Sequence, residues 1–506
     1  MSAIKFFYQT LTTPFTPLLV LGHRYQPIYA NVRPLHNTCN GCLLIRCDEG
    51  QVTPIDTFPD DVLLEIFDFC MDEARPTKKG IEAWQSLVHV CRRWRRVVFG
   101  SPRRLNLRLV CTDKTPARDT LDVWPALPLF IRCYGNYTTH SVENIVAVLE
   151  HSDRVYQIDL MYIPSPFLED VLAAMKEPFP VLTHLELSSS DESETIFPDS
   201  FLGGCAPRLQ FLWLNRIPFP GLPKLLLSAT HLVQLYLVNI SHSGYFSPEE
   251  MLNALSTLAR LSALHLDFQS PRSGPDWASR RLPPTIRSIL PDLTNVLFKG
   301  VSEYLEDIAA RIDAPRLKYL DITLFNQILF DTPQFIQFIS RTPTLKTLEK
   351  ARVAFADGAA RINLSSQTSG FGELTVKIQC RELDWQVSSL EQVCTSCLPP
   401  LSSLDDLYIY MDKVGYWRDN VENTLWLELL RPFMAVKNFY LSKQVAPRIM
   451  PALQELVGSR ATEVLPTLKN IFLEGFQSSG LVQEGVGQFV ATRQVTNHPI
   501  AISSWS

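Results

Sequence analysis

Residues 209–214 read LQFLWL, residues 232–237 read LVQLYL and residues 261–266 read LSALHL, and these stretches decide the fold of the 506-residue chain. Each has an apolar residue at its first, fourth and sixth positions. Side chains two residues apart in a β-strand point to the same face, and the first residue reaches the same core from the preceding turn. Each stretch therefore predicts a short strand with one apolar face.

The same pattern recurs along most of the chain. Further copies, some of them imperfect, open at Val155, Leu182, Leu293, Leu317, Leu345, Phe371, Leu404, Val436 and Leu468. The mean spacing of about 28 residues lies within the roughly 20–29 residues of leucine-rich repeats. Helix-like stretches, such as 141–151 and 247–261, separate the strands. A single repeat cannot bury its apolar face alone, so neighbouring repeats must stack.

We therefore expect an α/β fold, with an irregular leucine-rich-repeat solenoid over residues 141–506 that has a curved parallel sheet and outer helices. The alternative is an ordinary α/β domain, although a doubly wound sheet rarely supplies so many copies of one short pattern. Residues 1–54 are rich in Pro and Thr and predict a loosely ordered leader. Residues 110–140 predict a Pro-rich connector that includes a short apolar strand at 129–131.

Composition excludes several classes of protein. Hydrophobic residues make up 46% of the chain, charged residues 20%, and the formal net charge is -5. This composition is typical of a folded protein. The negative net charge argues against electrostatic binding of the whole chain to nucleic acid or to an anionic membrane. Eleven scattered cysteines favour free thiols in the cytoplasm or nucleus. No stretch approaches the roughly 20 apolar residues that a membrane span needs.

A compact helical unit precedes the repeats, and its charges are segregated. Residues 56–73 contain seven acids and no Lys or Arg, whereas residues 75–108 contain ten basic residues and one acid, Glu82. Pro59, Asp60 and Asp61 predict a helix entrance, because carboxylates favour the positive end of a helix. The apolar run that follows is too long for a solvated helix. Apolar residues at helical spacing predict one further helix over 81–98.

The cluster RRWRR at 92–96 admits a nucleic-acid or nuclear-import interpretation. Trp94 falls on the apolar stripe of its predicted helix, and the neighbouring acidic half would repel phosphate. We therefore expect the arginines to lie on a solvated face.

Two stretches of this unit, FPDDVLLEIF at 58–67 and LVHVCRRWR at 87–95, resemble the F-box motif. The match covers residues 55 to about 109 and departs from the motif by an insertion at 71–82, as in a large group of fungal F-box proteins with leucine-rich repeats. The resemblance implies that the unit binds the Skp adaptor and, through it, a cullin. The adaptor-binding residues that it implies are Phe58, Pro59, Leu63, Ile66, Phe67, Leu87, Val90, Cys91 and Trp94.

The resemblance thus implies a non-catalytic, substrate-recognition subunit of a Skp–cullin–F-box ubiquitin ligase. The surplus apolar residues of the first helix agree with a helix-packing partner, although they could instead pack on the repeats. A non-ligase scaffold, and a repeat array that only holds its fold, are the alternatives. Consistent with a non-enzyme, the sequence contains no G-x-G-x-x-G, G-x-x-x-x-G-K-[ST], H-E-x-x-H or G-x-S-x-G motif.

The residues between the core positions of each strand predict the surface that binds a protein substrate. They are rich in the aromatic residues that anchor protein interfaces. The candidate substrate-binding residues are Phe211, Trp213, Tyr236, Tyr319, Tyr408 and Tyr440. Alternatively, these rings only pack sideways on one another along the sheet.

Two groups of cysteines have spacings that occur in metal or redox sites. His36, Cys39, Cys42 and Cys47 are compatible with four zinc ligands, and Cys394 and Cys397 form an isolated C-x-x-C pair. A zinc site usually brings two pairs that close a small fold, and residues 1–54 lack such a fold. We therefore expect free thiols, no metal and no cofactor.

Overall fold

The computed structural model describes residues 44–46, 52–54, 58–72, 83–191, 196–198, 200–271, 287–326, 330–346, 348–366, 372–399, 401, 403–412, 421–475 and 481–505. The chain divides into two compact units, unit 1 at Met1–Leu160 and unit 2 at Met161–Ser506. The division falls within strand β5 (Val155–Ile163). Within the described ranges, no helix has both the length and the apolar composition of a bilayer span.

Unit 1 begins with a two-stranded antiparallel ribbon and three helices. The ribbon pairs β1 (Leu44–Arg46) with β2 (Val52–Pro54), and the helices are α2 (Asp60–Asp72), α3 (Ala83–Val88) and α4 (Arg92–Gly100). The helices enclose a small core in which the rings of Phe67 and Trp94 lie 4.8 Å apart between centroids. Both side chains are fully buried.

The charge segregation of the sequence has a structural role in unit 1. Arg93 of α4 pairs with Asp60 at the start of α2, with 2.6 Å between Nη2 and Oδ1. Arg104 pairs with Glu65 one turn further along α2. The basic half of the unit therefore holds the acidic half by ion pairs as well as by the apolar core.

The single helix expected over 81–98 is wrong, because the chain breaks between α3 and α4. Residues 89–90 form a turn, and Cys91 takes an extended conformation at the N-cap of α4. The Cys91 sulfur accepts a hydrogen bond from the Trp94 backbone N–H at 3.4 Å. The cap starts a separate helix at Arg92, and Trp84 of α3 and Trp94 of α4 are both buried.

The segment that we expected to be a connector holds regular structure. It contains α5 (Ala117–Val123), β4 (Leu129–Tyr134) and most of β3 (Leu109–Thr112), and β3 pairs with β4 in parallel. Its prolines fall outside these elements: Pro116 precedes α5, and Pro125 and Pro128 lie between α5 and β4. Proline is tolerated at such positions because no helix or ladder N–H is needed there.

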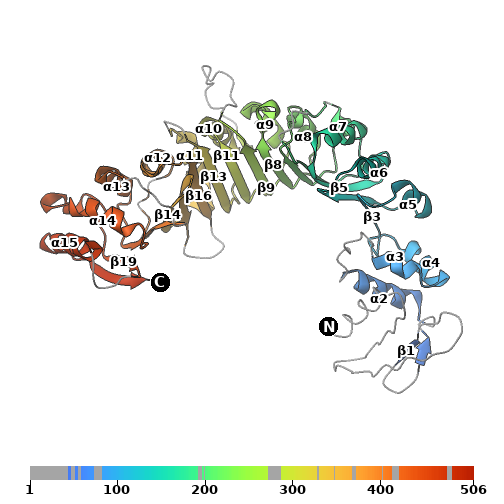
Figure 1. Ribbon diagram of the computed structural model, residues 1–506, viewed down its shortest axis with the longest axis horizontal. Coiled ribbons are helices and arrows are strands. Elements are labelled where there is room, and N and C mark those ends of the chain that lie inside the picture. Colours follow the sequence, from blue (N-terminus) through green and yellow to red (C-terminus); the bar gives the residue numbers. More distant parts are fainter. Residues whose placement is uncertain are drawn as a thin grey trace. The chain divides into compact units, whose positions relative to one another are not determined.

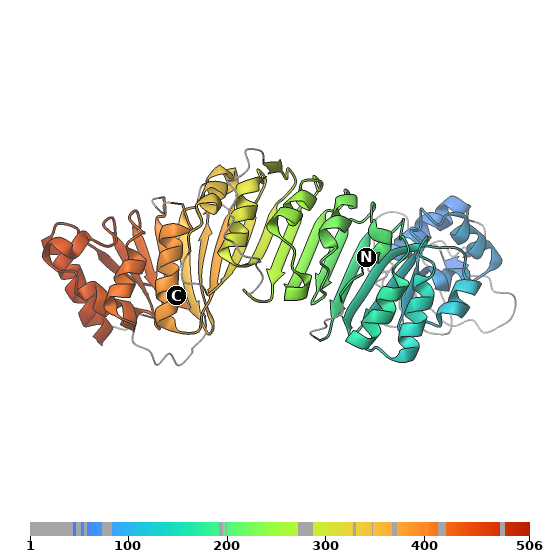
Figure 2. The ribbon, with the colours of Figure 1, turned by 90° about the horizontal axis from the view of Figure 1, so that it is seen from above.

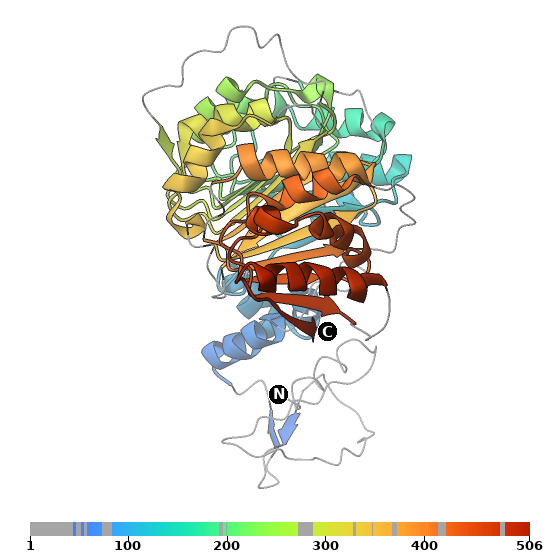
Figure 3. The same cartoon turned by 90° about the vertical axis from the view of Figure 1, so that its left-hand side faces the viewer.

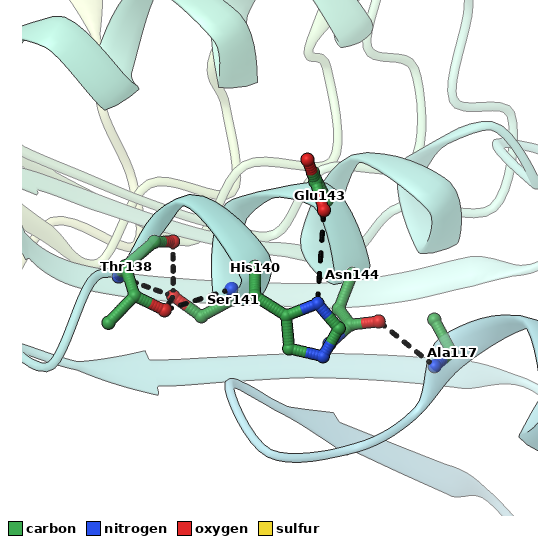
Figure 4. Close-up of polar contacts among 6 residues, drawn as sticks. All are labelled: Ala117, Thr138, His140, Ser141, Glu143 and Asn144. Atoms are coloured by element: carbon green, nitrogen blue, oxygen red, sulfur yellow. Dashed lines mark hydrogen bonds and ion pairs between the residues drawn. The ribbon is translucent and has the colours of Figure 1, made fainter.

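Helix α6 (Thr139–Leu149) connects to α5 through polar contacts (Figure 4). Thr138 and Ser141 cap α6 reciprocally, each side chain accepting the other's backbone N–H. Pro116 gives α5 no side-chain cap, but the Asn144 side-chain oxygen accepts the Ala117 N–H at 3.4 Å. The second helix therefore caps the first.

Unit 2 is a long sheet that is mostly parallel. In spatial order its strands are β6 (His184–Ser189), β7 (Phe211–Asn215), β8 (Gln234–Ile240), β9 (Ala263–Phe268), β11 (Asn295–Gly300), β13 (Tyr319–Phe325), β16 (Glu373–Gln379), β15 (Ala359–Ser365), β14 (Lys350–Ala356), β17 (Asp406–Met411), β18 (Asn438–Leu441), β19 (Asn470–Glu474) and β20 (Ala501–Trp505). A separate parallel pair joins β10 (Ser288–Ile289) and β12 (Ile312–Asp313).

Helices cover one face of this sheet, and the other face is open (Figures 1 and 3). Figure 2 shows the helices of unit 2 side by side in the order of the chain. They are α7 (Ser165–Ala174), α8 (Leu222–Ser228), α9 (Pro248–Leu255), α10 (Ser302–Arg311), α11 (Pro333–Arg341), α12 (Leu383–Ser396), α13 (Asn423–Leu430), α14 (Ala446–Gln454) and α15 (Leu481–Val495), with short 3-10 turns at Phe201–Gly204, His242–Gly244, Pro343–Leu345 and Gly458–Thr462.

The repeat pattern places its core residues as expected. The first, fourth and sixth residues of the stretches at 209–214, 232–237 and 261–266 are all buried, and the residues between the fourth and sixth are partly exposed on the open face. The architecture is therefore of the leucine-rich-repeat type.

Among the described strands of unit 2, the parallel order is interrupted once, by strands β14, β15 and β16. β14 pairs antiparallel with β15, and β15 pairs antiparallel with β16. Two residues, Asp357 and Gly358, join β14 to β15, and Gly358 has a φ of +84°. Asp-Gly is favoured in two-residue hairpin turns because such turns need positive φ. The expected all-parallel sheet is therefore wrong at this point.

Neighbouring repeats also stabilise one another through helix caps. Thr332 gives α11 no side-chain cap. Instead the carboxylate of Glu306, on the neighbouring helix α10, accepts the backbone N–H groups of Gln334 at 3.0 Å and Phe335 at 2.7 Å. A carboxylate at a helix N-terminus also interacts favourably with the helix dipole.

We predict that Glu306→Ala lowers the free energy of unfolding by about 1 kcal/mol, as loss of an N-cap does. Urea denaturation followed by circular dichroism measures the change. Glu177→Ala, at an exposed position between α7 and β6, is the control and should leave the midpoint unchanged. Equal midpoints for the two variants would contradict the capping role.

Candidate interaction surfaces

The three-helix unit divides the predicted adaptor-binding residues between its core and its surface. Four of the nine, Leu63, Phe67, Leu87 and Trp94, are buried in the core of the three helices. They can shape a docking surface but do not form it. The others are accessible: Pro59 is exposed, and Phe58, Ile66, Val90 and Cys91 are half-buried.

The accessible apolar residues of α2 form a stripe along one side of the helix. Val62 is 38% exposed and Phe69 is 43% exposed. With Pro59 and Ile66 they lie three or four residues apart, so all four share one helix face. We call Pro59, Val62, Ile66 and Phe69 the α2 stripe. Val62 and Phe69 were missing from the predicted adaptor-binding set, although their spacing from Ile66 in the sequence was the available signal.

Polar contacts fix the N-terminal end of the α2 stripe. Arg93 donates to the Phe58 backbone carbonyl at 2.5 Å and to Asp60. These contacts hold the chain where it enters α2. The arginines Arg92, Arg95 and Arg96 are exposed, as expected for a solvated face.

Phe67 and Phe69 should differ in their response to substitution, although they are two residues apart. We predict that Phe67→Ala destabilises the three-helix unit by about 3–5 kcal/mol, because it leaves a cavity in the core. Phe69→Ser should cost much less, about 1 kcal/mol, because Phe69 is 43% exposed and its removal leaves no cavity in the core. Hydrogen exchange of the α2–α4 amides measures both, and similar loss of protection in the two variants would contradict this assignment.

Three of the predicted substrate-binding residues lie close together near one end of the open face. The Phe211 ring stacks on His184 at 4.1 Å between centroids and lies 5.6 Å from Tyr236. Trp213 lies opposite Tyr236 in the strand register. Tyr236 in turn contacts His265 edge to face at 6.1 Å. We call these five residues the N-terminal aromatic patch.

Electrostatics distinguish the two histidines of this patch. His184 lies 2.9 Å from the Glu186 carboxylate. Burial lowers the pKa of His265, although Asp267 and Asp321 act in the opposite direction. His265 is therefore neutral at pH 7, and its ring contacts Tyr236 in this neutral form.

Tyr408 and Tyr440 lie in a second group of rings. Tyr440 is sandwiched between Tyr408 at 4.1 Å and Phe472 at 4.4 Å, with 8° between the ring planes in both pairs. Trp505 of β20 lies 6.0 Å from Tyr440 at a steep angle of 85° and donates a hydrogen bond to the Leu441 carbonyl. We call Tyr408, Tyr440, Phe472 and Trp505 the C-terminal aromatic stack. Trp505 was not predicted, because strand β20 lacks the repeat pattern.

A polar ladder runs beside this stack on the same three strands. Asn438 donates to Asp406, and Asn470 donates to Asn438, each at 2.8 Å. Burial, together with the neighbouring Tyr408, raises the pKa of Tyr440 to about 12. Aligned rings and aligned amides indicate that sideways packing along the sheet is a main role of Tyr408 and Tyr440.

The six predicted substrate-binding residues do not form one site. Strands β7 and β17 are eight places apart in the sheet, which corresponds to about 40 Å at roughly 4.8 Å per strand. Tyr319 lies between the two groups and donates to the Asp321 carboxylate at 3.1 Å. Burial and that carboxylate raise the pKa of Tyr319 to about 12. The open face therefore has two separate aromatic areas with a charged region between them.

Of the two cysteine groups, the pair Cys394 and Cys397 lies in the part of the chain that the structure describes. No cluster of His, Cys, Asp and Glu among the described residues is arranged to hold a metal, and His36, Cys39, Cys42 and Cys47 lie outside them. Burial raises the pKa of Cys397 to about 11 and that of Cys394 still further. Both thiols therefore stay protonated at neutral pH, which disfavours a redox role.

Comparison with known proteins adds little to this description. No protein-family model matches the sequence, and no curated protein matches it. Among solved structures, the chain is similar to the leucine-rich-repeat-containing protein LegL7 from Legionella pneumophila, with 12% sequence identity and a TM-score of 0.26; the match covers 71% of this chain and 96% of that chain.

We predict that Tyr440→Ala lowers stability by about 1–3 kcal/mol, because it removes two stacked ring pairs worth roughly 0.5–1.5 kcal/mol each. Tyr440→Phe keeps the ring and should be nearly neutral. Thermal unfolding of the two variants measures the difference. If Tyr440→Ala unfolds like the wild type, the stack does not stabilise the sheet.

Proposed function

We propose that this chain is a substrate-recognition subunit of a Skp–cullin–F-box ubiquitin ligase. Helices α2–α4 would bind the Skp adaptor, and the open face of unit 2 would hold a protein substrate. The observation that carries the proposal is the α2 stripe, which exposes apolar side chains within a stretch whose sequence resembles an F-box. Its residues are accessible in a unit that already has its own core.

The chemistry of the α2 stripe favours a helical partner. Apolar side chains spaced three and four residues apart are the pattern with which one helix packs on another. Large apolar residues with about 40% exposure, such as Val62 and Phe69, gain stability when a partner removes them from water. The ion pairs from Arg93 and Arg104 keep α2 fixed, so docking need not order it first.

A subunit of this kind needs no catalytic group. Holding a substrate lysine near a ubiquitin-charged enzyme makes the transfer nearly intramolecular, and the thioester chemistry belongs to other subunits. The proposal therefore includes no cofactor, no nucleic acid and no membrane partner. The protein would work in the cytoplasm or the nucleus.

A non-ligase scaffold is the second candidate. Its F-box would bind the adaptor, and its repeats would hold a partner that is not degraded. The open face, with its N-terminal aromatic patch and its C-terminal aromatic stack, is compatible with either function. Precipitation of the chain from cells separates them, because a ligase subunit brings a cullin with the adaptor and a scaffold does not.

We predict that Val62→Ser with Phe69→Ser weakens adaptor binding by roughly tenfold or more. A side chain of this kind contributes about 1.5–3 kcal/mol when it goes from fully exposed to fully buried; about 40% of each remains to be buried here, and 1.4 kcal/mol corresponds to a factor of ten. Binding is measured by titrating purified Skp adaptor against the full chain. Val123→Ser, at an apolar position of α5 that is 73% exposed, is the matched control.

The control variant should bind the adaptor as the wild type does. If the wild type folds but does not bind the adaptor, the F-box assignment fails, and the chain acts only through its repeats. If the double variant binds normally, the α2 stripe is not the docking surface.

A further inference from the structure

Three cations lie diagonally across adjacent strands of the open face. Lys377 of β16 is directly opposite Arg361 of β15 in the register. Arg352 of β14 is opposite Asn363, two residues from Arg361, and on its other side it is opposite Tyr408 of β17. Lys350 lies two residues before Arg352, and alternation along the strand places it on the same face.

This arrangement is unfavourable in the free protein. Like charges directly opposite each other in neighbouring strands destabilise a sheet. Arg361 is compensated by Asp412 at 2.9 Å and donates to the Tyr410 hydroxyl at 3.3 Å. Within the described residues, no ion pair is formed by Lys377, Arg352 or Lys350. The Arg352 guanidinium lies 5.6 Å from the centre of the Tyr408 ring.

The carboxylates nearby are engaged with other groups. Glu373 accepts a hydrogen bond from Asn363 at 2.6 Å, and Asp406 accepts one from Asn438. Asp412 is already paired with Arg361. Asp406 lies directly opposite Lys350 in the register. Lys377 and Arg352 are therefore the cations that face the open side of the sheet without a carboxylate of their own, and Arg352 lies beside the C-terminal aromatic stack.

We infer that Lys377 and Arg352, with Tyr408 beside them, bind an acidic segment of a protein partner. Guanidinium groups bind carboxylates in bidentate geometry, and the exposed edge of the aromatic stack accepts an apolar side chain of the same segment. A nucleic acid fits less well, because it carries a phosphate at every nucleotide and some of these would meet Asp321, Asp412 and Glu373, whereas a peptide can place its carboxylates at the cations alone. The inference rests on the proposed function, since it specifies the substrate that the repeats would hold.

The test uses the full chain and a random twelve-residue phage-display library as the probe. The wild type should enrich peptides with two or more Asp or Glu residues next to an aromatic residue. A selected peptide, synthesised with a fluorescent label, should bind Arg352→Glu with Lys377→Glu at least tenfold more weakly than the wild type. Its affinity should also fall as salt is raised.

The matched control reverses two exposed cations elsewhere in unit 2, with Lys224→Glu and Arg260→Glu. It should bind the selected peptide as the wild type does. Selection of peptides without acidic residues, or binding by the reversed variant within twofold of the wild type, would overturn the inference.

A second variant with a smaller change tests whether loss of peptide binding comes from misfolding. Lys377→Gln removes the charge opposite Arg361, so we expect an equal or higher Tm together with weaker peptide binding. A lower Tm with unchanged binding would overturn the inference. Adaptor binding is measured on the same preparations, so that the two proposals can fail separately. If the chain does not bind the adaptor, the F-box assignment fails. If it selects no acidic peptides, the inference about the open face fails.

Discussion

The fold of unit 2 depends on one constraint, that a short strand with a single apolar face cannot bury that face alone. Leu212 and Leu214, or Leu235 and Leu237, are removed from water only when a neighbouring strand and a covering helix are in place. Polar contacts between repeats follow the same rule. Glu306 of one helix caps the next helix, and Asp406, Asn438 and Asn470 hydrogen-bond from strand to strand. Each repeat is completed by its neighbours.

The parts of the fold that obey this constraint could be predicted from the sequence. A leucine at the first, fourth and sixth positions identifies a strand and its buried side, whatever surrounds it. The interruption at β14–β16 was not predicted because β14 and β15 depart from the pattern, although Asp357-Gly358 was a turn signal in the sequence; β16 keeps the pattern, with Leu374 and Val376 buried. The strand that contains Trp505 has no leucine pattern, and its pairing with β19 depends on contacts distant in sequence.

The candidate sites were less predictable than the fold, because residue type does not reveal which side of an element meets solvent. Leu63 and Phe67 match the F-box pattern and are buried, whereas Val62 and Phe69 are exposed on the same helix. On the open face, the aromatic residues were identified from alternation alone. Their division into two areas depends on the number of intervening strands, which the interrupted part of the sheet increases.

The hairpin at Asp357-Gly358 also affects how unit 2 folds. Elsewhere in the sheet a strand usually pairs with the strand of the next repeat, but β13 pairs with β16, whose first residue follows the end of β13 by almost fifty positions. β14 meanwhile pairs with β17. The repeats before and after the interruption can therefore grow independently, and the two arrays join only when the local β14–β15–β16 meander has closed. In such a linear array, the strands up to β13 and the strands from β17 onward form two cooperative folding units, and the locally formed β14–β15–β16 meander connects them.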